Sequence, residues 1–101
     1  MKTYDGFAAL LAHADLLPNV GWIFVDAGID RASKDALSSA SFHVAETEAE
    51  SIDLEKSKRT FLECPTFVDI KSVADERAVK LDADEYLDAM LYYREYDDFQ
   101  N

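Results

Sequence analysis

The apolar run Trp22–Val25 constrains the fold most, because four consecutive residues of strong β-forming character predict a buried strand. Turn-forming residues follow it directly. Two other segments also have strand character: residues 40–45 alternate between small or polar and large apolar side chains, and residues 60–62 are Thr-Phe-Leu. We therefore expect a small sheet of about three strands.

Apolar residues recur at helical spacing on both sides of these segments. An N-terminal helix is predicted over about residues 4–16, and Pro18 with Gly21 ends its pattern. A second helix is predicted over about residues 65–78, where Pro65 suits the first helical position.

The last predicted helix begins at a capping box. Asp82 can cap its first turn, and Glu85, three residues on, can reach back to the cap. We expect this helix to run to about residue 97. Residues 29–39 show only a weak, mixed pattern and are assigned no element.

These elements predict an α+β fold in which an antiparallel sheet of about three strands packs against one N-terminal and two C-terminal helices. A chain of 101 residues, 49% of them hydrophobic, has enough apolar material for one core, so residues 1–101 are expected to form a single domain. The core is expected to be centred on Trp22, Phe24, Phe42, Phe61 and Leu87.

The formal net charge is −11, and two segments account for all of it. Residues 46–55 hold five acids and no base, and residues 82–101 hold seven acids and one base. The other 71 residues hold nine acids and nine bases. Two acidic segments on an otherwise neutral domain favour a cationic partner and oppose direct binding to nucleic acid or to an anionic membrane surface.

The last helix is expected to carry a binding face. At 100° per residue its apolar side faces the core and its opposite side mixes carboxylates with two tyrosines. Tyrosine is favoured in interfaces, and carboxylates would orient a basic partner. The alternative is an ordinary solvated helix face. The candidate partner-binding residues are Asp84, Glu85, Asp88, Tyr92, Glu95 and Tyr96.

The other acidic segment has the same two interpretations. Glu46, Glu48 and Glu50 would lie on one side of an extended segment, where they favour the approach of something basic. These three residues are therefore further partner-binding candidates. The alternative is neutralisation within the chain by the bases that follow, at residues 56–59.

Catalytic candidates are few, and the chain is not expected to be an enzyme. His13 and His43 have no nearby residue in the sequence that would form a proton relay, and a lone Cys64 is typical of buried filler. No phosphate-binding glycine loop, nucleophile elbow or zinc-protease helix occurs. No catalytic residue, metal site or cofactor is therefore predicted.

The expected location is the cytoplasm. A single cysteine cannot form an intramolecular disulfide, which fits a reducing compartment. The N-terminal residues lack the pattern of a signal peptide, and no apolar stretch is long enough to span a bilayer.

Several segments together resemble a group of small acidic bacterial proteins. They are Trp22–Val25, Thr60–Leu62, Val68–Ile70, and the tyrosine-rich acidic ending Glu85–Tyr93 and Tyr96–Phe99. The group comprises the immunity proteins encoded beside polymorphic toxins, including those of contact-dependent growth inhibition systems. The resemblance extends over about residues 4–99.

This resemblance implies that the protein binds and neutralises the toxic C-terminal domain of a cognate effector. Many such domains are nucleases with basic clefts, which suit a carboxylate-rich surface. Two other functions stay open. One is an acidic nucleic-acid mimic that inhibits a DNA- or RNA-binding protein of a host or phage. The other is a small acidic enzyme or ligand-binding domain.

Overall fold

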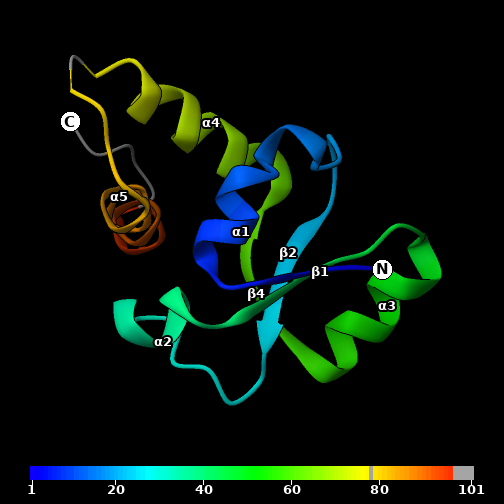
Figure 1. Ribbon diagram of the computed structural model, residues 1–101. Coiled ribbons are helices and arrows are strands. Elements are labelled where there is room, and N and C mark those ends of the chain that lie inside the picture. The colour runs from blue at the N-terminus through cyan, green and yellow to red at the C-terminus, as the bar shows by residue number, and fades with distance from the viewer. Residues whose placement is uncertain (78, 97–101) are drawn as a thin grey trace.

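A computed structural model, which describes residues 1–77 and 79–96, shows an α+β fold built on a four-stranded sheet (Figure 1). The strand order is β1-β3-β2-β4, and every pairing is antiparallel. The strands are β1 (Lys2–Asp5), β2 (Trp22–Asp26), β3 (Ser41–Val44) and β4 (Lys58–Glu63). The helices are α1 (Phe7–Ala12), a 3₁₀ turn η1 (Ala14–Leu16), α2 (Lys34–Ser38), α3 (Glu48–Ser57), α4 (Cys64–Asp75) and α5 (Ala83–Tyr96).

The helices cover the two faces of the sheet unequally. The main core lies under α1, α4 and α5, and α3 lies on the other side of the sheet (Figure 1). Strand alternation divides β2 between these sides: Ile23 and Val25 belong to the main core. Phe24 points the opposite way, and it is buried outside the main cluster, as is Leu54 of α3.

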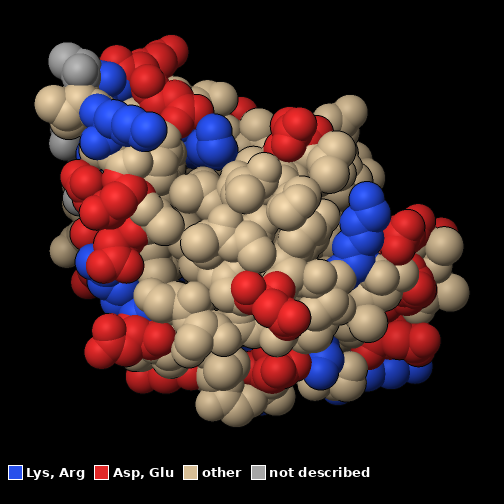
Figure 2. Space-filling view, viewed as in Figure 1, with Lys and Arg blue, Asp and Glu red and all other residues tan. Residues whose placement is uncertain are grey.

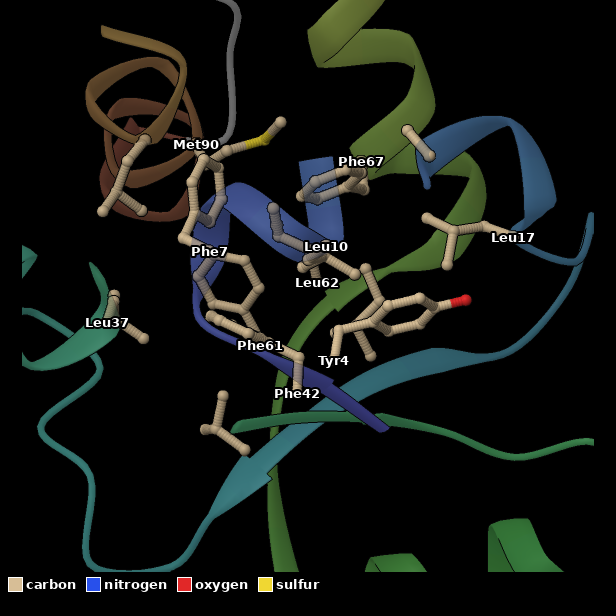
Figure 3. Packing of buried hydrophobic residues seen from close by; sticks show 14 of the residues in the cluster. Tyr4, Phe7, Leu10, Leu17, Leu37, Phe42, Phe61, Leu62, Phe67 and Met90 are labelled. Carbon is tan, nitrogen blue, oxygen red and sulfur yellow. The ribbon is translucent and has the colours of Figure 1, made fainter. Parts of the chain in front are cut away.

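Aromatic rings fill the centre of the main core (Figure 3). The ring of Phe42 lies 5.3 Å from that of Phe61 and 6.2 Å from that of Phe7, measured between centroids. Phe7 in turn lies 6.0 Å from Phe67 of α4. These contacts join β3, β4, α1 and α4, so the sheet and its helices share one core.

The predicted helix over residues 4–16 is wrong at its start. Residues Lys2–Asp5 form the edge strand β1, paired with β3, and this is the fourth strand that the sequence did not indicate. Gly6 separates β1 from α1. Its φ is 91°, a backbone conformation that residues other than glycine rarely adopt. The apolar spacing continues through this break, which explains the error.

The prediction that Trp22 is a core residue is also wrong. Trp22 shares the face of Phe24, opposite the main core, and is the first residue of β2, where 39% of it is exposed. The other four predicted core residues, Phe24, Phe42, Phe61 and Leu87, are buried.

The region between β2 and β4 contains two helices that the sequence analysis did not predict. Ser33 caps α2 by accepting a hydrogen bond from the backbone N–H of Ala36. Thr47 caps α3 in the same way, since its side-chain oxygen accepts a hydrogen bond from the backbone N–H of Glu50. The glutamates at 48 and 50 are therefore in the first turn of a helix, where acids are favourable, and not in an extended segment.

The two C-terminal helices are confirmed. The capping box of α5 is present, since Glu85 N donates to Asp82 Oδ1 at 2.9 Å and Asp82 N donates to Glu85 Oε1 at 3.2 Å. α4 ends at Asp75, short of its predicted end at about residue 78, and the predicted end of α5 at about residue 97 lies outside the described residues.

Replacing Gly6 with alanine is expected to destabilise the protein by about 1–3 kcal/mol, the usual cost of such a backbone conformation. The added Cβ would also lie 3.3 Å from the Ser38 carbonyl oxygen. Gly28→Ala is the matched control, since its Cβ would meet nothing within 4 Å. Urea denaturation measures both, and equal midpoints for the two variants would contradict this account of Gly6.

Candidate partner-binding surfaces

The exposed side of α5 carries the candidate residues predicted from the sequence. Asp84, Glu85, Asp88, Glu95 and Tyr96 are exposed, and Tyr92 is half-buried. Figure 2 shows carboxylates gathered over the α5 edge of the molecule, with some basic side chains among them. The helical period therefore assigned this face correctly.

Lys34 of α2 lies against this acidic face and was missed by the sequence analysis. Its ammonium lies 3.1 Å from Asp88 Oδ1 and 3.8 Å from Asp84 Oδ2. The hydrogen bond to Asp88 raises the pKa of Lys34 above its ordinary value. The first half of the face is thus partly neutralised within the chain, whereas no described residue forms an ion pair with Glu95 near its end.

Two other predicted residues on α5 also have roles within the fold. Glu85 accepts a hydrogen bond as part of the capping box described above. The ring of Tyr92 packs against that of Tyr96, with 4.6 Å between centroids. Tyr96 itself is 58% exposed, so this pair presents an aromatic surface beside Glu95.

Arg94, the only base in α5, faces the body of the protein. Its Nε donates to the Phe61 carbonyl at 3.0 Å and its Nη1 donates to the Arg31 carbonyl at 2.7 Å. Arg31 donates in turn to the Thr60 carbonyl at 2.9 Å. The two arginines thus satisfy carbonyls of the edge strand β4, and the outward charge of α5 is left negative.

The second acidic segment lies at the other side of the molecule, around the start of α3 (Figures 1 and 2). Glu46 and Glu50 lie 2.9 Å and 2.7 Å from the ammonium group of Met1, and this contact lowers the pKa of Glu50. Glu48 is exposed and has no ion pair with any residue that the structure describes. The sequence left open that the bases at residues 56–59 neutralise this acidic segment. Lys58 does not do so, because it pairs with Asp26 instead.

Of the three side chains considered for catalysis, His43 and Cys64 are buried and His13 is exposed. His43 lies outside the main core cluster, and it is buried between Thr3 Oγ1 at 3.2 Å and Asp26 Oδ1 at 3.0 Å. Cys64 is fully buried, and burial raises its pKa to about 11, so its thiol is protonated at neutral pH. Over the described residues, no three His, Cys, Asp or Glu side chains are placed to hold a metal ion.

Asp26 is expected to make the stability depend on pH. Hydrogen bonds from Lys58 and then from His43 lower the pKa of Asp26. The ionised carboxylate of Asp26 therefore stabilises the folded protein. This stabilisation is present above the unfolded-state pKa, near 4, and is lost as the pH falls through the lowered folded-state pKa. Because the side chain is 48% exposed, the contribution is discounted to about 0.5–1 kcal/mol.

The measurement is the free energy of unfolding of the wild type and Asp26→Asn at pH 6 and pH 2.5. The variant should be less stable at pH 6, and the difference should shrink at pH 2.5. A difference that stays constant between the two pH values would contradict the assigned role of Asp26. Asp69→Asn, at an exposed position on α4, is the control.

Comparison with models of protein families, with curated proteins and with solved structures gives no match. Within residues 1–77 and 79–96, no helix is long and apolar enough to cross a membrane.

Proposed function

We propose that this protein is an immunity protein, which binds the toxic C-terminal domain of a cognate bacterial effector and neutralises it in the cytoplasm. The observation that carries this proposal is the outward face of α5, where exposed carboxylates stand beside an exposed tyrosine. The sequence resemblance to immunity proteins supports the same function, and it rests in part on this same helix.

The spacing of the carboxylates suits an extended basic surface. Asp84, Asp88 and Glu95 are separated by four and seven residues, so they share one stripe of the helix. At 1.5 Å per residue this stripe is roughly 16 Å long. Such a row of negative groups can take the place of nucleic-acid phosphates in the cleft of a nuclease, and we propose that the toxin is of this kind.

The aromatic end of the stripe provides what the carboxylates lack. Exposed charges mainly speed association and fix orientation, whereas a rigid aromatic side chain supplies apolar contact area. Tyr96, supported by Tyr92, is placed beside Glu95 for that purpose. The proposed interface therefore runs along α5 from Asp84 to the aromatic pair of Tyr92 and Tyr96.

The test is binding to the C-terminal domain of the toxin encoded by the adjacent gene. The two purified proteins should co-elute in gel filtration at low salt, and association should slow as salt is raised, because exposed charges are screened. Failure to form a complex at low salt would overturn the proposal.

A further inference from the structure

A second surface, near the start of α3, combines exposed apolar side chains with acids. Pro18, Val20, Gly21 and Trp22 form one wall of an open hollow, and residues 44–48 with Ser51 form the other. Val20 is 77% exposed and Trp22 is 39% exposed. A neighbouring depression extends this surface past Pro18 to Leu16, which is 55% exposed.

The fold does not require these apolar residues at the surface. Trp22 and Val20 lie outside the main core cluster, and grouped apolar side chains rimmed by polar ones are typical of interaction sites. Both are held in place, because Trp22 begins the strand β2 and Cys64 N donates to the carbonyl of Gly21, which lies between Val20 and Trp22, at 2.8 Å. The surface is therefore formed before any partner arrives, which lowers the cost of binding.

The charge around the hollow selects the partner. Glu46 and Glu48 line the hollow, which itself contains no lysine or arginine, whereas Lys2 lines the neighbouring depression. Glu46 contacts the Met1 ammonium, whereas Glu48 is exposed at the rim. A second copy of this chain would bring the same carboxylates together across a symmetric contact, which is unfavourable. A segment with an apolar side chain next to a lysine or arginine matches both features.

We propose that this hollow is a second docking site, in which a basic segment of the toxin domain places an apolar side chain against Val20 and Trp22 and a cationic one at Glu48. This inference rests on the proposed function, since the toxin domain is the partner. Buried apolar contacts mainly slow dissociation, whereas exposed carboxylates such as those of α5 mainly speed association. The two surfaces thus have separable kinetic effects.

The experiment compares dissociation rates from the adjacent-gene toxin domain for Val20→Asp and Val79→Asp. The two valines are similarly exposed, at 77% and 67%, but Val79 is not part of the hollow. Val20→Asp should dissociate at least tenfold faster than the wild type, and Val79→Asp should stay within twofold. Glu48→Lys and Glu55→Lys, both exposed on α3, are compared for the rim charge by their association rates, and Glu48→Lys should slow association more.

A second readout does not depend on how a variant folds. Trp22 is the only tryptophan, so 5-fluorotryptophan labels this site alone, and its ¹⁹F resonance should shift when the toxin domain binds. Binding with an unmoved resonance and unchanged dissociation of Val20→Asp would overturn this inference and leave the proposed function standing. No binding by the wild type would overturn both. A shift that appears with rising protein concentration and no toxin would indicate self-association and also overturn it.

Discussion

Phe42→Ala is expected to lower the free energy of unfolding by about 3–5 kcal/mol, the usual cost of removing a fully buried phenylalanine. Phe42 has no exposed surface and lies in the interior strand β3. Its ring contacts those of Phe7 and Phe61, so truncation leaves a cavity where β3, β4 and α1 meet. Urea denaturation followed by circular dichroism measures the loss.

Trp22→Ala is the matched aromatic control for this prediction. Trp22 is larger than Phe42, but it lies outside the main core and is partly exposed. Its replacement should cost less than half as much as Phe42→Ala. A larger loss for Trp22→Ala would mean that the sequence-based assignment of Trp22 to the core was right and the arrangement described above is wrong.

Charge reversal along α5 is expected to slow association with the toxin domain by roughly 10- to 100-fold at low salt, because electrostatic steering raises association rates by such factors. The variant carries Asp84→Lys, Asp88→Lys and Glu95→Lys together. Its association rate should also lose most of its dependence on salt. Stopped-flow mixing at several ionic strengths measures both effects.

A control variant changes the net charge equally at exposed positions away from α5. It carries Asp15→Lys, Asp69→Lys and Glu55→Lys. The control should slow association much less than the α5 variant, because steering depends on where the charge lies. Since the α5 variant also removes the contacts of Lys34, circular dichroism should confirm that it folds. Equal association rates for the two variants would remove the α5 face from the proposed interface.

The sequence predicted the candidate face of α5 well, because helical spacing places Asp84, Asp88 and Glu95 on one side whatever the tertiary structure is. Lys34 could not be found in the same way. It is 54 positions from Asp88 in the sequence, and only the packing of α2 against α5 brings the two together. Partners distant in the sequence leave no local pattern.

The errors in the fold have similar physical causes. β1 is four residues long and runs straight into the apolar spacing of α1, so only its pairing with β3 and the backbone of Gly6 mark it as a strand. Trp22 looked like core because an apolar run gives no sign of which residues face which side. The exposed position of Trp22 then pointed to the apolar part of a second surface, of which the sequence had indicated only the acids.

Growth protection tests the proposed function most directly. Cells that express the C-terminal domain of the adjacent-gene toxin should stop growing, and co-expression of this protein should restore growth. The α5 charge-reversal variant should protect less well than the control variant of equal charge. Arrested growth in the presence of the folded wild-type protein would contradict the proposal that it is the immunity protein for that toxin.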